Sequence, residues 1–199
     1  MSRPRDQASR RAQLVQAASR AVLERGLTKA RLRDVADHAG LTSASVLYYY
    51  RDMEDLLAAV FEQGTRTYID RRRAAVGASS DAWEQLAACI RSGVPFPGEP
   101  QATSRLLYEL VPLTFRNETA AALQATFFSE QADLYRQVLT SGEDSGTFHL
   151  LAPADFLARS FVALEDGYGI EVLAGTTPAD EIERRLLRHA ILAMQAPRA

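Results

Sequence analysis

The chain has 199 residues, 47% of them hydrophobic, so it can form a packed core without disulfide or metal support. Its single cysteine, Cys89, excludes an intramolecular disulfide and gives no sign of a thiolate metal cluster. The arginine-rich N-terminus lacks an apolar signal segment, and no stretch reaches the ~18 apolar residues of a spanning helix. These features predict a cytoplasmic protein without a membrane partner.

The net charge of −2 is divided unevenly along the chain. Residues 1–51 contain ten Lys or Arg and four Asp or Glu, a net charge of +6, which leaves −8 on the remainder. A basic first quarter on an acidic body is expected where only that quarter contacts a polyanion. A chance excess of solvated arginine is the alternative.

Apolar residues recur at helical spacing almost throughout, and no alternating run is long enough for a sheet, so an all-α fold is predicted. The first helix covers about residues 9–25 and ends at Gly26. A second, short helix ends at Gly40. Thr42 can cap a third helix over 43–49, and Asp52 can cap a fourth that ends near the arginine run 71–73.

Five more helices are predicted, which makes about nine in total. They cover approximately residues 81–92, 103–115, 118–140, 154–174 and 178–195. The segment VPFPGEP, residues 94–100, is expected to be a loop because it holds three prolines. SGEDSG, residues 141–146, and AGTTP, residues 174–178, are the later breaks.

The second and third helices have the proportions of a DNA-reading helix-turn-helix. Gly40 supplies the positive φ of a sharp turn, and Leu41 is expected to pack inward. Val46 and Tyr50, four residues apart, are predicted to face the core. The opposite face of the third helix then offers Ser43, Ala44, Leu47 and Tyr48.

The segment GLTKARLRDVADHAGLTSASVLYYYRDMEDLLAAVF, residues 26–61, resembles the signature of the TetR family of bacterial transcriptional regulators. The resemblance implies an N-terminal three-helix DNA-binding domain over residues 1–52 and a C-terminal helical domain over 53–199 for dimerisation and ligand binding. It also implies a homodimeric, sequence-specific repressor that releases a palindromic operator when a small molecule binds. No catalysis, metal or cofactor is expected.

The segment departs from the family pattern in three ways. Leu47 replaces a phosphate-contacting Tyr, Met53 replaces a Lys, and Ala30–Arg31 replace a helix-capping Ser or Thr. Tyrosine hydroxyls and nearby arginines can still contact phosphate. The predicted DNA-contacting residues are Arg31, Arg33, Thr42, Ser43, Ala44, Ser45, Leu47, Tyr48, Tyr49, Arg51 and Met53.

The third helix, SASVLYY, contains no Arg, Lys, Asn or Gln, the side chains that make bidentate contacts with bases. Few direct contacts between this helix and base edges are therefore expected. DNA shape, water bridges and either Arg33 or an arginine-rich N-terminal arm are expected to supply specificity, although a solvated tail is the alternative for the arm. The arm contains Arg3, Arg5, Arg10 and Arg11.

Aromatic rings are frequent after residue 61 and can fill a core or line an apolar effector pocket. The candidates for the pocket are Trp83, Tyr108, Phe115, Phe128, Phe161 and Glu165, although an ion-paired or solvated role is the alternative for Glu165. A stripe of mostly small side chains over 154–174, with the last helix, resembles the family's four-helix dimer interface. Its candidate residues, for which packing within one subunit is the alternative, are Ser160, Ala163, Gly167, Ile170, Ala174, Ile182, Leu186, Ala190 and Ala193.

An enzyme is the main rival interpretation, and the sequence contains few residues or motifs that would support it. His38, His149 and His189 lie far apart along the chain, and neither a phosphate-binding glycine loop nor a G-x-S-x-G elbow is present. A second rival keeps the fold but acts through protein contacts, which the departures at Leu47 and Met53 allow. Binding to duplex DNA and its salt dependence distinguish that rival from a repressor.

Overall fold

A computed structural model describes residues 4–195, with the side chains of residues 7–194. The described residues form nine helices, which confirms the all-α prediction. The helices are α1 (Pro4–Arg25), α2 (Leu32–Ala39), α3 (Ser43–Tyr49), α4 (Met53–Val76), α5 (Ala82–Gly93), α6 (Glu99–Thr114), α7 (Glu118–Asp144), α8 (Ala154–Leu173) and α9 (Ala179–Ala193).

The described chain divides into two compact units. Unit 1 comprises residues 4–66 and 105–124, and unit 2 comprises residues 67–104 and 125–195. The boundaries fall inside α4, α6 and α7, whereas the sequence analysis places one boundary after residue 52. The difference arises because three helices contribute residues to both units.

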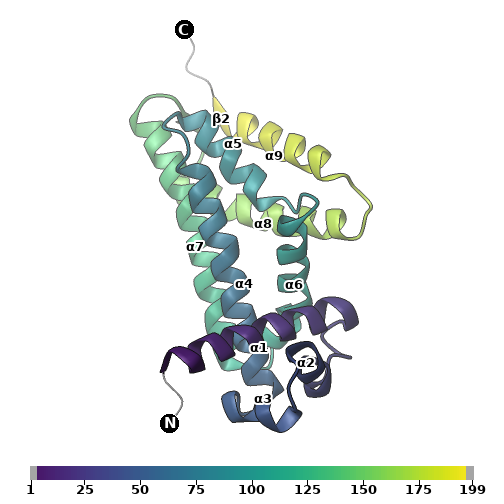
Figure 1. Cartoon of the computed structure of the whole chain (residues 1–199). Helices are drawn as coiled ribbons and strands as arrows, with labels where there is room; N and C mark the ends of the chain where they lie inside the picture. The colour runs from purple at the N-terminus through teal and green to yellow at the C-terminus, as the bar shows by residue number, and fades with distance from the viewer. Residues whose placement is uncertain (1–3, 196–199) are drawn as a thin grey trace. The chain divides into compact units, whose positions relative to one another are not determined.

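Unit 1 is built on the apolar stripe of α1, which lies over α2 and α3 (Figure 1). Leu14, Ala18 and Val22 are fully buried, as are Val35 of α2 and Val46 of α3. Burial of this stripe explains why the short second and third helices are stable, since helices of eight and seven residues are marginal alone.

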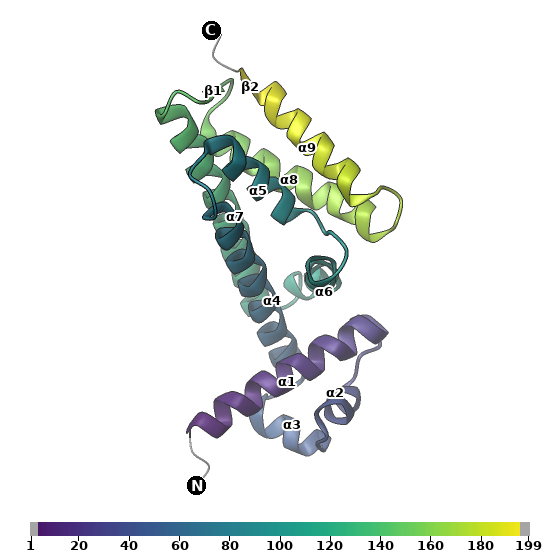
Figure 2. The ribbon, with the colours of Figure 1, turned by 45° about the horizontal axis from the view of Figure 1, so that its top comes forward.

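Unit 2 has its own core, and α8 and α9 lie side by side in both views (Figures 1 and 2). Fully buried residues of this core include Leu86 of α5, Tyr135 of α7, Phe161 of α8 and Leu186 of α9. Within this unit, the C-terminal part of α4 contacts α7, where the rings of Tyr68 and Phe127 meet edge to face with centroids 5.3 Å apart.

The helix α1 begins at Pro4, about one turn before the predicted start at residue 9, and the structure differs from the sequence analysis in three other places. The helix α6 begins at Glu99, inside the predicted loop 94–100, because Pro100 occupies its first turn, where a missing N–H is tolerated. The helix α7 continues to Asp144, through most of the predicted break 141–146. Two antiparallel strands, β1 (His149–Leu150) and β2 (Met194–Gln195), are too short to produce an alternating pattern.

Among the described residues, no helix is long and apolar enough to cross a membrane. Within the same range, no three His, Cys, Asp or Glu side chains come together in a group that could hold a metal ion.

Candidate functional site

The turn between α2 and α3 has the geometry that the sequence predicts. Gly40 adopts φ +65°, in the left-handed region that favours glycine, and the Leu41 N–H donates to the Ala36 carbonyl at 2.9 Å. The Thr42 hydroxyl accepts from the Ser45 N–H at 3.2 Å and so caps α3. The two short helices are thus joined and delimited by local chemistry.

The N-terminus of α2 lacks the usual Ser or Thr cap, and Asp34 supplies a partner instead. One Asp34 carboxylate oxygen accepts from the Arg31 N–H at 2.8 Å, and the other pairs with Arg25 Nε at 3.1 Å. A carboxylate is also favoured in a first helical turn by the helix dipole. The departure at Ala30–Arg31 therefore leaves this helix start stabilised, with Ala30 buried.

The helix α3 has one buried and one exposed face. Val46 and Tyr50 are buried, as predicted, while the Leu47 side chain is 46% exposed and Tyr48 is 74% exposed. Tyr48 also meets the ring of Tyr49 edge to face, with centroids 5.0 Å apart. An exposed leucine beside an exposed tyrosine is an unusual combination for a solvated helix face and suits contact with a partner.

Tyr50 fixes the end of this motif against α1. Its hydroxyl donates to the Arg11 carbonyl at 3.5 Å, and the Arg11 guanidinium lies 5.0 Å from the centre of its ring. Burial raises the pKa of Tyr50, so the ring enters the core as a neutral phenol. Arg11 thus belongs to α1 and packs on Tyr50, rather than forming part of a free arm.

The start of α4 is capped beside the exposed face of α3. Asp52 accepts from the Asp55 N–H at 2.8 Å. The side chain of Asp55 accepts from both the backbone and the guanidinium of Arg51, which lowers the pKa of that carboxyl. Arg51 itself remains largely exposed and can contact phosphate.

All the predicted DNA-contacting residues belong to unit 1. Arg33 is exposed and its Nε lies 3.8 Å from Asp37, whereas Arg31 turns back to donate to the Thr28 and Ala30 carbonyls. Thr42 and Ala44 are exposed, and the four residues Ser43, Ser45, Tyr49 and Met53 are partly buried. Of the predicted arm, Arg3 and the side chain of Arg5 lie outside the described residues, and Arg10 donates to Gln13 within α1.

The residues predicted to line an effector pocket are divided between the two units. Tyr108 and Phe115 belong to unit 1, where Phe115 is 79% exposed, and the other four belong to unit 2. Phe128 is 42% exposed, and Trp83 packs edge to face on Phe148 with centroids 4.8 Å apart. A groove of about 360 Å³ in unit 2, lined in part by Phe96, Val172 and Pro178, contains none of the six.

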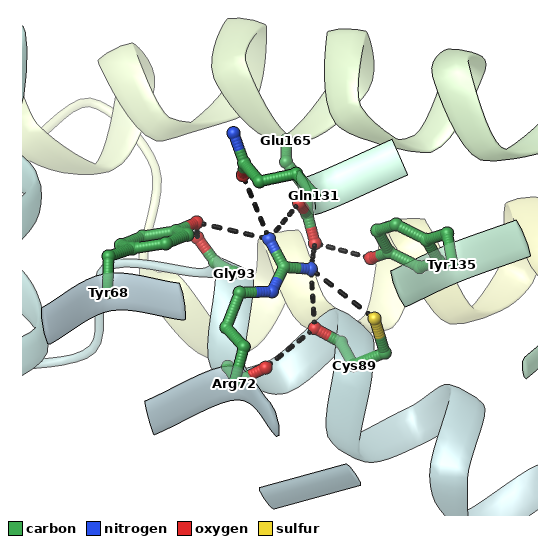
Figure 3. Close-up of polar contacts among 8 residues, drawn as sticks. Tyr68, Arg72, Cys89, Gly93, Gln131, Tyr135 and Glu165 are labelled. Carbon is green, nitrogen blue, oxygen red and sulfur yellow. Dashed lines mark hydrogen bonds and ion pairs between the residues drawn. The ribbon is translucent and has the colours of Figure 1, made fainter. Parts of the chain in front are cut away.

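Phe161 and Glu165 lead instead to a buried polar cluster that the sequence analysis did not identify (Figure 3). Its centre is Arg72 of α4, whose side chain has no exposed surface. The two terminal nitrogens of Arg72 donate to the two carboxylate oxygens of Glu165, at 2.8 and 3.0 Å. Tyr135, stacked on Phe161, donates its hydroxyl to the same carboxylate.

Helices α4, α5 and α7 complete the cluster around Arg72. Its guanidinium donates to Gln131 Oε1 at 3.1 Å, to the Tyr68 hydroxyl oxygen at 3.3 Å and to the Cys89 carbonyl at 2.9 Å. The Tyr68 hydroxyl in turn donates to the Gly93 carbonyl at 3.2 Å. Arg72 is therefore bonded to side chains or backbone from four helices, including α8 through Glu165.

Burial governs the proton affinities in this cluster. It raises the pKa of the Cys89 thiol to about 11, which keeps this cysteine an unreactive thiol. It also raises the pKa of Glu165, against the opposing effect of Arg72. Next to Glu165, burial and the Glu165 charge raise the pKa of Asp166 to about 6.

A bare backbone at Gly93 makes room for the Glu165 carboxylate. A β-carbon added at Gly93 would lie 2.1 Å from Glu165 Oε1, closer than any real contact. The sequence contained one signal for the cluster, because Arg72 shares a helix face with the buried residues Tyr68, Ile69 and Val76. The run of three arginines obscured that signal, since positive charge is common at helix ends.

The residues predicted for a dimer interface separate into two groups. On α8, Ala163, Gly167 and Ala174 are exposed, Ile170 is 58% exposed and Ser160 is partly buried. On α9, the three residues Ile182, Leu186 and Ala190 lie in the core of the same chain, and Ala193 is partly buried. The exposed apolar residues of α9 are instead Ile191 and Leu192.

Comparisons with known proteins agree with this geometry. Residues 14–60 match the model of the tetR family of bacterial regulatory proteins. A transcriptional regulator from Saccharomonospora viridis, solved with choline, is 23% identical with a TM-score of 0.87, covering 96% of this chain and 100% of that one. A TetR regulator from Haloarcula marismortui is 22% identical with a TM-score of 0.85, covering 94% of this chain and 100% of that one.

A TetR-family regulator from Rhodococcus sp. is 20% identical with a TM-score of 0.76, covering 94% of this chain and 100% of that one. A comparison with curated proteins finds no match. The family resemblance of the helix-turn-helix is thus confirmed by an independent model and by the fold. Residues 14–60 thus match the model of the tetR family of bacterial regulatory proteins, and the described chain has the fold of TetR-family transcriptional regulators.

Proposed function

We propose that this TetR-family regulator is a homodimeric repressor that binds a palindromic operator and releases it when a small molecule binds unit 2. The observation that carries the proposal is the exposed face of α3, with Leu47 and Tyr48 beside the capped start of α4. Such a face meets base edges and phosphates when α3 enters a major groove. We place this action in the cytoplasm, without a cofactor.

Phosphate contacts in this proposal come from hydroxyls, arginines and backbone. The exposed hydroxyl of Tyr48 and the exposed guanidiniums of Arg33 and Arg51 reach outward from unit 1. The free N–H groups at the start of α4 add a partial positive charge. These groups compensate for the phosphate anchors missing at Leu47 and Met53.

Homodimerisation is supported by the exposed small and apolar side chains of α8 and α9. Ala163 and Gly167 allow close approach of a second helix, while Ile170 and Ile191 are exposed apolar residues that a partner would bury. Since Ile182, Leu186 and Ala190 pack within one chain, α9 contributes its exposed residues to the proposed interface. Two copies are required because a palindrome presents two half-sites, roughly 34–36 Å or a multiple apart.

A small-molecule effector is supported by the relative from S. viridis, which was solved in complex with choline. In the present chain, α4 connects the two units, with Leu56 in the core of unit 1 and Arg72 in the buried cluster of unit 2. A ligand that moves α4 would therefore alter the spacing of the two recognition helices. A tenfold change in operator affinity requires about 1.4 kcal/mol of preference for one state.

Selection from a random duplex library with the full-length protein tests the proposal. We expect enrichment of a two-fold symmetric site, weaker binding by Arg33→Ala and Tyr48→Phe, and unchanged binding by Arg66→Ala. Arg66 is a matched control because it pairs with Glu62 four residues away, as Arg33 pairs with Asp37. Failure to enrich any site, or equal binding by all three variants, would contradict a DNA-reading role for α3.

A further inference from the structure

The buried ion pair of Arg72 and Glu165 is not expected to add much to the stability of the fold. Removing two charges from water costs several kcal/mol each, and buried ion pairs replaced by apolar residues often leave a protein equally or more stable. A fully buried arginine in unit 2, bonded to groups from four helices, is therefore a candidate for a binding function.

The cluster also contains hydrogen-bond donors without acceptors. Among the described residues, the buried side-chain atoms without a partner are Arg71 Nε, Arg71 Nη2, Arg72 Nε and Gln131 Nε2. Every one of them is a donor, and Arg72 and Gln131 are at least 99% buried. Unsatisfied donors of this kind require an acceptor, and charged donors bind carboxylates most strongly.

We propose that the effector of this regulator carries a carboxylate, which takes the place of the Glu165 carboxylate on Arg72. In the present structure Glu165 occupies the two parallel donors of Arg72 in the way a bound carboxylate would. The inference rests on the proposed function of unit 2 as an effector domain. It assigns Arg72 as the primary ligand of the effector and Gln131 as a second donor.

Charge balance favours this exchange over binding of a cation. A ligand carboxylate keeps one anion on Arg72, whereas a cation that took the place of Arg72 on Glu165 would leave the buried guanidinium without a counter-ion. A displaced Glu165 does not have to remain a second buried anion. Because burial raises the pKa of both Glu165 and Asp166, either carboxyl can take up a proton from solvent when the ligand binds.

The position of Glu165 also leaves it replaceable. Its carboxylate rests against the side-chain-free backbone of Gly93 and is held by Arg72 and the Tyr135 hydroxyl. Both groups are hydrogen-bond donors, and they can donate in the same way to another carboxylate that takes the place of Glu165. Tyr68 and Tyr135 lie against the Arg72 guanidinium, with ring centres 5.5 and 5.2 Å from its central carbon, and keep it in place.

Thermal unfolding and calorimetry of the full-length protein, without DNA, test the exchange. The probes are acetate, hexanoate and benzoate, with acetamide, hexanamide and benzamide as uncharged controls and matched sodium chloride throughout. Glu165→Gln keeps the shape of the side chain but weakens its bond to Arg72. Glu165→Ala removes a group about the size of acetate. The double variant Arg72→Met with Glu165→Leu replaces the pair by apolar side chains.

We expect at least one carboxylate to bind Glu165→Gln at least about tenfold more tightly than wild type, because the competing internal anion is gone. Acetate should raise the Tm of Glu165→Ala, while amides, and all probes on the double variant, should have no effect. The Tm of wild type should rise only slightly, or only at the highest carboxylate concentration, because Glu165 competes with the added carboxylate for Arg72.

Two results would overturn the proposal. In the first, no carboxylate stabilises Glu165→Gln or Glu165→Ala more than its amide does. In the second, only Glu165→Ala responds, which means that Arg72 can hold a carboxylate but Glu165 is never displaced. Either result leaves selection of an operator by the same protein unaffected, so failure of this inference is distinguishable from failure of the proposed function.

Discussion

Arg72 shows how strongly the cost of a buried charge depends on its partner. Removing the arginine alone leaves Glu165 buried without its counter-ion, so Arg72→Met should lower the free energy of unfolding by about 3–5 kcal/mol. Adding Glu165→Leu should recover most of that loss, because no buried charge remains. Urea denaturation followed by circular dichroism measures both variants. A double variant no more stable than the single one would show that the pair itself stabilises the fold.

Asp166 gives the same region a pH dependence with a defined sign. Its pKa is about 6 in the folded chain, whereas the ordinary value for an aspartate is 3.8, so the folded state binds the proton more tightly than the unfolded state does. Ionisation therefore reduces stability as the pH rises from about 4 through 6. Asp166→Asn should therefore raise the free energy of unfolding by about 1–3 kcal/mol relative to wild type at pH 7.5, and by much less at pH 4.5.

Urea denaturation at the two pH values checks the Asp166 prediction, and Asp133→Asn is the control. Asp133 is exposed and pairs with Arg136, so its substitution should have little effect at either pH. An advantage of Asp166→Asn that is the same at both pH values would contradict the pKa assigned to Asp166.

At the scale of elements, the proposed recognition helix α3 has an unusual set of side chains. Its exposed residues include Ala44, Leu47 and Tyr48, and it has no amide or guanidinium group. Single hydrogen bonds from serine hydroxyls and apolar contact with thymine methyl groups are the base readout left to such a helix. Replacing thymine by uracil within the selected half-site should therefore weaken binding by about 1 kcal/mol for each contacted methyl.

Fluorescence anisotropy with paired thymine and uracil duplexes measures this effect, and uracil outside the half-site serves as the control. Leu47→Ala should reduce the difference between the two duplexes. Equal affinity of wild type for both duplexes would show that α3 does not recognise thymine methyls.

The same scale shows what a sequence can and cannot predict. The limits of α2 and α3 were predictable because Gly40 and Thr42 act on their own neighbours. The start of α6 at Glu99 was not predictable, because a proline is as well suited to the first turn of a helix as to the loop before it. The buried role of Arg72 was hidden for another reason, because its partners Glu165 and Gln131 lie far away in sequence.

For the molecule as a whole, the proposed dimer depends on exposed apolar side chains of α8 and α9. Ile170→Asp places a charge on that face and should convert a dimer, twice the chain mass of 21.9 kDa, into a monomer. Phe115→Asp is the matched control, since Phe115 is exposed and lies outside both helices. Sedimentation equilibrium measures the mass, and a wild-type monomer or an unaffected Ile170→Asp dimer would contradict the proposed interface.

The residues predicted for the dimer interface differ between α8 and α9 in their exposure. The stripe on α8 is exposed, but on α9 the periodic residues Ile182, Leu186 and Ala190 pack inside the chain. Helical periodicity shows which residues share a face, but it does not show whether that face meets the same chain or a second copy. The aromatic candidates for the effector pocket share this ambiguity, since rings that fill a core and rings that line a pocket look the same in sequence.

The salt dependence of binding to a selected duplex tests the central claim, that unit 1 reads DNA, most directly. Each phosphate neutralised should contribute about −0.9 to the slope of log affinity against log salt concentration. Two copies that each use Arg33 and Arg51 predict a slope of about −4 or steeper, which Arg33→Ala reduces by about 2. Absence of binding at low ionic strength, or affinity independent of salt, would contradict the claim.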